Sequence, residues 1–498
     1  MSLEPKACYR AVLARDARYD GRFFTCVRTT GIYCRPICPT RPPKFENCVF
    51  VPTAAAAQEA GFRPCLRCRP ESSPQLDAWQ GTLATVSRAW KLIEAGALDE
   101  GNVASLAERL GIGDRQLRRL LRQHVGASPI TMAQTRRVLL AKQLIHQTQL
   151  SMIDVALASG FGSVRRFNET FQKLYGRPPS AIRRRELASS SADLSILLPY
   201  QSPYDWQKML EFLRTRAIAE VETISGNAYM RTVDLDGQAG TVCVSDAPEQ
   251  SSLRVVFRIP RLEVLPSLIT RLRRQFDLAA DPHSIARVLS QDADLAPLVR
   301  ARPGLRVPGG WDGFEVAVRA VIGQQITLKG ATRLLGQLAI RLGSPLPLVE
   351  AEHVGLSRLF PRPEQLQREA IRELGIPMAR VESLLAIAAA CGANPQIFDP
   401  QRDLAESVAS LRSLRGVGEW TAQYIAMRAM GESDAFLAGD VGLQRRLARG
   451  NQKLASSQLL ARAEGWRPWR AYALLHVWMA DKEALQILNQ EPDYALST

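Results

Sequence analysis

Four cysteines near the start of the chain have the spacing of metal ligands. Three residues separate Cys34 from Cys38, two separate Cys65 from Cys68, and twenty-six lie between the pairs. Two close pairs joined by a longer loop can present four sulfurs tetrahedrally, and an all-sulfur tetrahedral site selects zinc. We therefore expect one Zn²⁺ on these four residues, and spacing alone favours a purely structural zinc ribbon.

A second group of residues that could carry out chemistry lies between 411 and 443. Gly416 and Gly418 predict a tight hairpin between two helices, the second at 420–430, because glycine reaches positive φ without steric cost. Backbone N–H groups at such a hairpin have no partner inside the helix and can bind a phosphate. Asp440 follows Gly418 by 22 residues and is the acid we single out.

Aromatic residues follow the hairpin. Trp420 and Tyr424 are spaced i, i+4, so they share one face of the predicted helix. An electron-rich aromatic wall attracts a cationic ring by stacking and by cation–π interaction. For any one of these residues alone, a place in the hydrophobic core is the commoner explanation.

The pattern LxxLxGVGxxTA followed by a distant Asp resembles the helix-hairpin-helix DNA glycosylases, and residues 193–490 resemble DNA-3-methyladenine glycosylase II. The resemblance implies that Asp440 is the catalyst, stabilising an oxocarbenium-like sugar and orienting water. The alternative is an N-cap aspartate before VGLQRRL, and one residue could serve both roles. It also implies that Trp478 is a third aromatic of the base pocket. Gln325, in VIGQQIT, takes the wedge position, although an ordinary polar helix residue is the alternative.

Three departures from the family pattern refine this expectation. Relatives with Schiff-base chemistry carry Lys at the position of Trp420, so we expect a monofunctional glycosylase that leaves the strand intact. Gly439 and Val441 flank the acid where the family often has an acid and an aromatic residue. These two differences change the expected shape of the pocket and leave the range of excised bases open.

Residues 1–75 resemble the zinc domain of the Ada adaptive-response proteins across the four cysteines. The resemblance implies that Cys34 is a nucleophile that accepts a methyl group from a methylphosphotriester of DNA. Zinc keeps a thiolate deprotonated at neutral pH. Methylation of one of four thiolates removes one negative charge, so affinity for DNA should rise.

Residues 80–187 contain two related segments. ASLAERLGIGDRQLRRLL and VALASGFGSVRRFNETF share an Ala–Gly spacing, a basic helix and a closing Gly-x-x-Pro at an offset of 49–50 residues. Paired units of this kind resemble the AraC-type DNA-binding domain, with recognition helices near 114–123 and 163–173. Candidate contacts with DNA are basic side chains on these helices, namely Arg115, Arg118, Arg165 and Arg166.

Charge and cysteine are concentrated in the N-terminal part. Residues 1–190 hold 29 Lys and Arg against 15 Asp and Glu, which accounts for nearly all of the net charge of +15. Seven of nine cysteines lie in the first 68 residues, which favours metal or thiol chemistry over disulfides. A basic half with helix-turn-helix patterns predicts a nucleic-acid partner.

These observations predict a multidomain, mostly α protein of four parts. The parts are a small zinc-bound α/β domain at 1–75, an all-α double helix-turn-helix domain at 80–187, a small antiparallel α+β subdomain at 193–280, and an all-α helix-hairpin-helix body at 281–490. The seam is a Ser-rich linker near 189–191. Without a signal peptide or a membrane span, we expect a bacterial cytoplasmic, nucleoid-associated monomer.

The leading hypothesis is a fusion that excises alkylated purines such as 3-methyladenine, accepts methyl groups from methylphosphotriesters, and switches on the adaptive response. Its partners would be double-stranded DNA and, during activation, RNA polymerase. One alternative is a damage-responsive transcription activator whose glycosylase body only binds DNA. Another keeps the glycosylase and makes the zinc domain purely structural.

Overall fold

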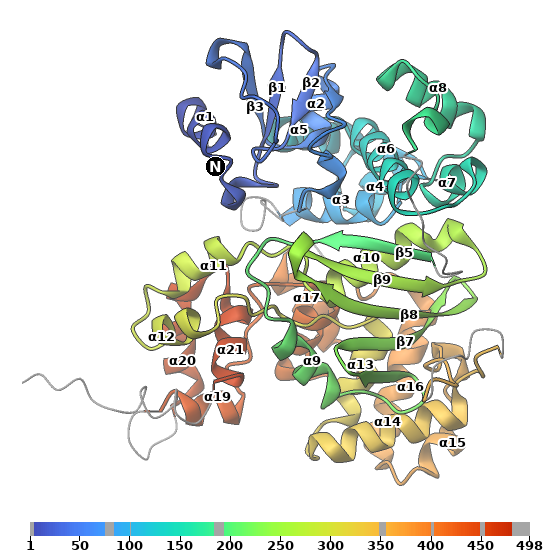
Figure 1. Cartoon of the computed structure of the whole chain (residues 1–498). Coiled ribbons are helices and arrows are strands. Elements are labelled where there is room, and N and C mark those ends of the chain that lie inside the picture. The colour runs from blue at the N-terminus through green and yellow to red at the C-terminus, as the bar shows by residue number, and fades with distance from the viewer. Residues whose placement is uncertain are drawn as a thin grey trace, which may run out of the picture.

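The computed structural model describes residues 4–74, 84–99, 101–183, 194–347, 355–399, 403–448 and 454–480. The serine linker at 189–191 and the end of the expected glycosylase body, beyond 480, lie outside the described residues. Helices dominate, and two small sheets accompany them (Figure 1). The expected fold class, mostly α with a small α/β part and an α+β part, is confirmed.

The N-terminal lobe is a four-stranded sheet with one helix before its first strand and a second helix between β3 and β4. Its strand order is β3-β1-β2-β4, and β1 pairs antiparallel with β2 and β3, whereas β4 pairs parallel to β2. The short strands leave little core, which suits a lobe held together by a metal. The elements are α1 (Pro5–Ala14), β1 (Phe24–Val27), β2 (Ile32–Cys34), β3 (Cys48–Val51), α2 (Ala54–Glu59) and β4 (Arg63–Pro64).

Six helices follow, and they form the two helix-turn-helix units. Both predicted recognition helices exist, and each ends at a left-handed glycine, Gly126 or Gly176. The N-cap of α8 is Ser163, whose side chain accepts from the N–H of Arg166, whereas α5 begins after Gly113 without a side-chain cap. The long helix between the units is also present. The helices are α3 (Ala84–Glu94), α4 (Val103–Arg109), α5 (Asp114–Val125), α6 (Pro129–Gln147), α7 (Met152–Ala158) and α8 (Val164–Tyr175).

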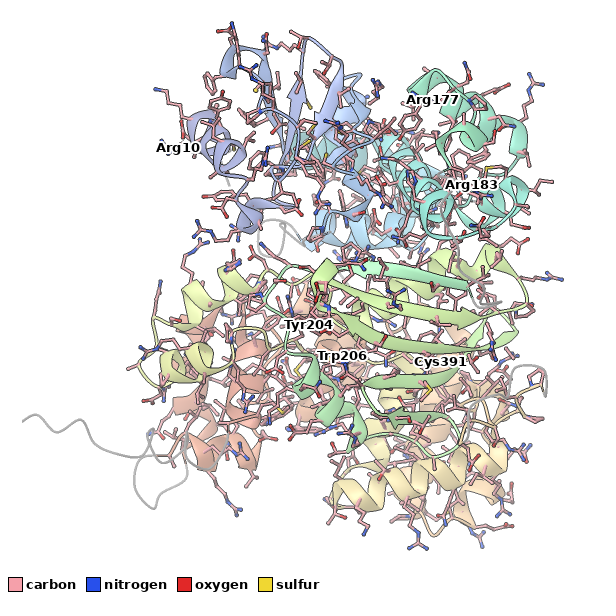
Figure 2. All side chains as sticks on the ribbon, in the orientation of Figure 1. Arg10, Arg177, Arg183, Tyr204, Trp206 and Cys391 are labelled. Carbon is pink, nitrogen blue, oxygen red and sulfur yellow. The ribbon has the colours of Figure 1, made fainter. Side chains whose placement is uncertain are left out.

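A five-stranded antiparallel sheet lies directly below these helices in Figure 1. Its order is β5-β9-β8-β7-β6. Helix α9 packs beside β6 and β7 and begins at Trp206 (Figure 2). The ring of Trp206 packs against that of Phe276, with centroids 5.6 Å apart. The elements are β5 (Leu194–Pro199), α9 (Trp206–Arg214), β6 (Glu222–Ser225), β7 (Ala228–Leu235), β8 (Gln238–Ala247), β9 (Ser252–Arg258) and α10 (Leu265–Gln275).

The remainder is helical, as predicted from His283 onward. No helix among the described residues is long and apolar enough to span a membrane. Its elements are α11 (Pro282–Leu289), α12 (Leu295–Ala301), α13 (Gly313–Ile322), α14 (Leu328–Leu342), α15 (Arg368–Arg372), α16 (Met378–Ala393), α17 (Leu404–Arg412), α18 (Glu419–Ile425), the π-helix η9 (Ala426–Met430), α19 (Val441–Arg446), α20 (Ser456–Ala463) and α21 (Arg470–Trp478).

Short 3₁₀ helices lie in the loops between these elements. They are η1 (Ala17–Tyr19), η2 (Phe45–Asn47), η3 (Pro70–Ser72), η4 (Pro179–Ile182), η5 (Pro248–Gln250), η6 (Leu262–Val264), η8 (Pro363–Gln365) and η10 (Glu464–Trp466).

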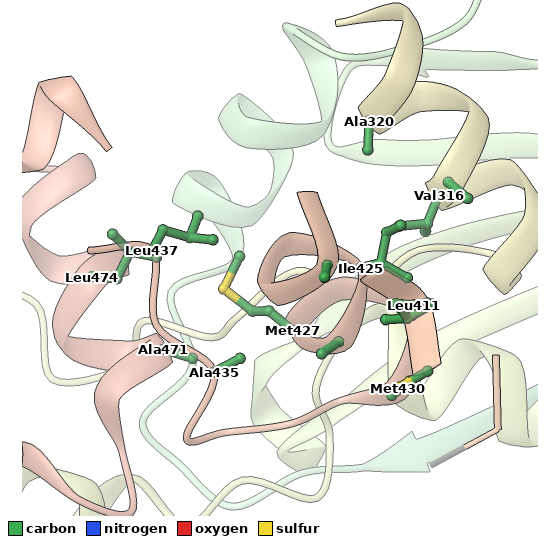
Figure 3. Packing of buried hydrophobic residues seen from close by; sticks show 14 of the residues in the cluster. Val316, Ala320, Leu411, Ile425, Met427, Met430, Ala435, Leu437, Ala471 and Leu474 are labelled. Atoms are coloured by element: carbon green, nitrogen blue, oxygen red, sulfur yellow. The ribbon is translucent and has the colours of Figure 1, made fainter. Parts of the chain in front are cut away.

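Two large apolar cores organise the chain below the zinc lobe. One fills the helical body and includes Ile425, Met427 and Leu474 (Figure 3). The other joins the second helix-turn-helix unit to the sheet, because Leu144 and Ile196 belong to the same buried cluster. The covalent linker is therefore not a boundary between cores.

Buried charges tie the sheet to the helical body. Arg231 on β7 lies 2.8 Å from Glu315 on α13, and Arg319 of α13 lies 2.6 Å from Glu222 on β6. The two glutamates are 7% exposed or less, so each needs its guanidinium partner to remain charged inside the protein. The network therefore specifies how α13 docks on the edge of the sheet.

His476 on α21 makes the stability of the body depend on pH. Burial lowers its pKa from 6.5 to about 4. Between these two pH values the unfolded chain therefore binds a proton that the folded chain does not bind. Stability is therefore intact above pH 6.5 and falls as the pH drops toward 4, by about 3 kcal/mol. Urea unfolding at pH 7 and pH 4 should show this loss in the wild type and a smaller loss in His476→Leu. Equal losses in the two proteins would contradict it.

Candidate functional sites

The four predicted zinc ligands converge. The sulfur atoms of Cys34, Cys38, Cys65 and Cys68 all lie within 4.8 Å of one another. Cys34 ends β2, whereas Cys65 directly follows β4, and the parallel pairing of these strands brings the two halves of the motif together. All four are free cysteines, so the geometry is that of a ligand cluster rather than of disulfides.

Backbone amides support the charge that such sulfurs carry. The N–H of Arg35 donates to Cys68 Sγ over 3.3 Å, and the N–H of Arg67 approaches Cys65 Sγ at 3.4 Å. The hydrogen bond with Cys34 is the largest cause that lowers the pKa of the Cys38 thiol, to about 6. Four soft donors with this support fit a zinc ion, and the expected single Zn²⁺ site is confirmed.

Cys34 differs from the other three sulfurs in its exposure. Cys38, Cys65 and Cys68 are at most 9% exposed, whereas Cys34 is only partly buried. A sulfur that reacts with a substrate has to be reachable, so its lower burial makes Cys34 the cluster member best placed to react. Of the remaining cysteines of this lobe, Cys8 and Cys26 are buried and Cys48 is partly exposed.

The zinc lobe is bonded to the helix-turn-helix domain through Lys142 on α6. Its ammonium donates to the carbonyl of Cys65 over 3.0 Å and to Glu71 Oε2 over 2.7 Å. Lys142 and Glu71 have side-chain exposures of 0% and 1%. A metal-ligand residue is thus held by a buried cation from the neighbouring domain.

Lys142→Met should leave Glu71 buried with Arg69, 3.2 Å away, as its remaining ion-pair partner among the described residues. Loss of one member of a buried pair costs about 3–5 kcal/mol, whereas loss of both is far milder. We expect the single variant to unfold at clearly lower urea concentration and Lys142→Met with Glu71→Gln to recover most of the difference. A double variant no more stable than the single one would refute this account.

The glycine hairpin is tight because α16 approaches it. Gly416 has φ +79°, and a β-carbon there would lie 2.0 Å from Ser383 Oγ. Only glycine fits this position. Of the two hairpin glycines only Gly416 takes positive φ; Gly418 has φ −81° and is the N-cap of α18. Its open backbone leaves the N-terminus of α18 accessible for a phosphate.

The helix predicted at 420–430 is shorter than expected. It is α-helical only to Ile425, after which Ala426–Met430 form the π-helix η9, which ends at Gly431 with φ +68°. The change of helix type follows from tertiary packing, which buries all five residues of η9. A π-helical turn often marks a functional site.

Trp420 and Tyr424 lie on one face of α18. Their rings stack with centroids 5.3 Å apart and planes 9° apart. Trp420 is 37% exposed, which is unusual for so large an apolar side chain. Trp420 is therefore exposed enough to contact another ring, whereas Tyr424 is partly buried against the core of the helical body.

Asp440 caps the short helix α19. Its Oδ1 accepts from the N–H of Leu443 at 2.7 Å, and Nε1 of Trp478 approaches the same oxygen at 3.4 Å. The cap holds the carboxylate in one orientation, and the side chain remains partly exposed. The carboxylate can cap the helix and still react, because its second oxygen, Oδ2, accepts no hydrogen bond from a described residue.

Gln325 stands at the tip of the turn between α13 and α14 and is exposed. Its φ is +57°, which is strained for a residue with a β-carbon. The alternative of an ordinary helix residue is therefore wrong. Neighbouring Gln324 donates to the Gly416 carbonyl over 3.0 Å and to Thr421 over 3.2 Å. The turn is thus attached to the hairpin.

The prediction from the sequence did not include three residues that lie near the aromatic pair. Arg428 donates to the Tyr424 hydroxyl over 3.0 Å, and its guanidinium lies 4.7 Å from the Phe212 ring. Arg216 lies 3.7 Å from the same ring, and burial lowers its pKa to about 10. The i, i+4 spacing from Tyr424 could have identified Arg428. Phe212 and Arg216 reach the site only through tertiary packing.

The four candidate DNA-contact arginines lie on the outer faces of α5 and α8. Arg165 has 87% of its side chain exposed, although it pairs with Glu169, and Arg118 pairs with Asp114 over 3.7 Å. Phe167 and Phe171 on the opposite face of α8 are fully buried. Each recognition helix therefore presents its basic face to solvent.

Comparison with known proteins identifies the whole chain. Residues 7–71 match the metal binding domain of Ada, residues 106–185 a helix-turn-helix domain, and residues 195–312 the AlkA N-terminal domain. A "Probable bifunctional transcriptional activator/DNA repair enzyme AlkA" of Mycobacterium tuberculosis is 39% identical over 477 residues, which cover 95% of each chain. The chain belongs to this family of bifunctional transcriptional activator/DNA repair enzymes.

Relatives of the separate halves agree with the expected fusion. DNA-3-methyladenine glycosylase 2 of Escherichia coli is 32% identical over 287 residues, covering 57% of this chain and 96% of the relative. Ada of Escherichia coli, a bifunctional transcriptional activator and repair enzyme, is 39% identical over 121 residues, covering 24% of this chain and 33% of the relative. The resemblance to an Ada-like half joined to an AlkA-like half is confirmed.

Proposed function

We propose that this protein repairs alkylated DNA by two reactions. The C-terminal half hydrolyses the N-glycosidic bond of alkylated purines such as 3-methyladenine, with Asp440 as catalyst. The N-terminal half takes a methyl group from a DNA methylphosphotriester onto Cys34. The observation that carries the first reaction is the oriented carboxylate of Asp440 on the helical body that also presents the stacked Trp420–Tyr424 pair.

The geometry suits a cationic base that leaves readily. An alkylated purine placed on the Trp420 ring gains stacking and cation–π attraction. Departure of the base takes the electrons of the N-glycosidic bond and leaves positive charge on the sugar. Asp440 stabilises that charge, and water adds to the anomeric carbon while its proton passes to the carboxylate or to solvent.

The sites on the hairpin would hold the substrate. The N-terminus of α18 at Gly418 would bind a backbone phosphate, and the strained turn at Gln325 would enter the space left by the extracted nucleotide. Val441, 44% exposed beside the catalyst, offers less bulk than an aromatic residue, so larger alkyl adducts should also be accepted.

Asp440→Asn tests the glycosylase and its catalyst together. The amide keeps an oxygen for the N-cap but carries no charge, so release of 3-methyladenine from methylated duplex DNA should fall at least 100-fold, or about 3 kcal/mol of barrier. Folding should be preserved, as shown by an unchanged urea midpoint. Equal release by both proteins would place the catalyst elsewhere, and release by neither would favour an activator that only binds damage.

The methyl transfer follows from the sulfur chemistry. Cys34 Sγ attacks the methyl carbon of the phosphotriester, the C–O bond breaks, and the phosphodiester leaves with the electron pair. A zinc ion held by Cys34, Cys38, Cys65 and Cys68 would keep the Cys34 sulfur deprotonated and therefore nucleophilic. The product is a thioether, so each molecule reacts once, and the site loses one negative charge. That loss lowers repulsion of the DNA backbone.

Cys34→Ala should abolish uptake of radiolabelled methyl groups from methylphosphotriester DNA, because no other ligand sulfur is comparably exposed. Cys48→Ala is the matched control, since Cys48 is also partly exposed but lies outside the cluster. The control should take up methyl groups normally. Undiminished uptake by Cys34→Ala would remove the nucleophile assignment and leave a structural zinc site.

The regulatory role is the third part of the proposal. Arg115, Arg118, Arg165 and Arg166 would position α5 and α8 on promoter DNA. Ile153 and Leu157 lie one turn apart on α7, 57% and 36% exposed, and supply an apolar surface for RNA polymerase. We infer a monomer that works on the nucleoid in the cytoplasm.

A further inference from the structure

A cavity of about 390 Å³ lies between the DNA-binding half and the glycosylase half. One wall comes from α3 and α6, the opposite wall from α10 and the π-helix η9 with the residues after it. Its size is that of a small-molecule site. None of the DNA-binding or catalytic residues discussed above lines it.

Two cationic side chains in the walls of the cavity lack a full set of hydrogen-bond acceptors among the described residues. Lys91 on α3 is half-buried, and no described residue accepts a hydrogen bond or ion pair from it. Its Nζ would lie 3.9 Å from a β-carbon placed on Gly431, so it points at the end of η9. Nη1 of Arg273 on α10 is buried without an acceptor among the described residues. Both residues line the cavity.

The carboxylates around the cavity are largely engaged. Asp399 bonds to Arg109 over 2.9 Å, which bridges the two halves at the rim, and Glu71 bonds to Lys142. Asp277 accepts from the Tyr472 hydroxyl over 2.7 Å. Glu94 is the carboxylate whose charge acts on Arg273. Glu432 also lines the cavity, and it and Glu94 each have a partner. Because Nη1 of Arg273 is buried without an acceptor among the described residues, the site favours a ligand that brings anionic oxygens.

The rest of the wall is apolar and partly aromatic. Trp90 on α3, Pro266 and Ile269 on α10, and Phe398 line the same cavity. Trp90 and Phe398 are only partly buried, so their rings remain available for contact with a flat ring. Adjacent cationic and aromatic walls suit a molecule with a phosphate at one end and a flat ring at the other.

We propose that this interdomain cavity binds a phosphorylated small molecule of mononucleotide size. The phosphate lies between Lys91 and Arg273, and the ring lies against Trp90. The ligand contacts both halves, so it stabilises their docked arrangement and rests against η9, whose Arg428 supports Tyr424. The site is independent of the proposed base excision and methyl transfer.

Isothermal titration of the full-length protein with AMP, adenosine and inorganic phosphate tests the proposal. AMP should bind, and adenosine and phosphate should each bind at least tenfold more weakly, because each supplies only half of the contacts. Lys91→Met and Arg273→Gln should weaken AMP binding about tenfold. Arg10→Gln, a charge-matched change on the exposed surface of α1 (Figure 2), should not alter it.

Ala95→Trp gives a second test that removes no charge. Ala95 lines the cavity but is exposed, so an indole there should narrow the entrance without disturbing the core. Thermal denaturation confirms that each variant is folded. Absence of AMP binding at millimolar concentration, or equal binding by the wild type, Lys91→Met, Arg273→Gln and Ala95→Trp, would overturn the proposal. Phosphate binding as tightly as AMP would overturn the role of Trp90.

Discussion

The ion pair between Lys142 and Glu71 is the contact on which the arrangement of the N-terminal half depends. Two charges without exposed surface are stable only when each satisfies the other, and Lys142 adds a bond to the carbonyl of a metal-ligand residue. The position of α6 is thereby determined relative to the zinc lobe. The hydrogen bond from Lys142 to the Cys65 carbonyl therefore connects the sulfur cluster directly to the helix that joins both helix-turn-helix units.

Helix α6 transmits this constraint to the rest of the molecule. On another side it bonds to the sheet of the glycosylase half, where the Gln143 amide donates to the Leu197 carbonyl over 2.7 Å and Gln147 accepts from the Leu197 N–H at 2.9 Å. Beside these bonds the apolar core is continuous across the linker. Removing residues 1–187 would expose that core, so point variants separate the activities more cleanly than truncation does.

The catalytic half uses short local structures to hold its groups. The acid is oriented by its own helix cap, the hairpin by a glycine that meets α16, and the turn of Gln325 by bonds from Gln324. Each of these three arrangements is formed by residues that are close together in the sequence, apart from one contact with a distant segment. This division explains why motif spacing predicted Asp440, Gly416, Trp420 and Tyr424 as candidates, whereas Phe212 and Arg216, more than 200 residues before Tyr424, gave no signal.

The sequence by itself determined the fusion, the zinc ligands, the duplicated helix-turn-helix units and the hairpin, because each depends on residue types at short, regular spacings. Only the tertiary structure decided that Gly418 is a cap, that the second hairpin helix ends in a π-turn, and that Cys34 is the least buried of the four cluster cysteines. It also decided how the halves dock and which cations face the cavity between them. These outcomes depend on packing between segments far apart in the chain, where burial and charge pairing outweigh local preference.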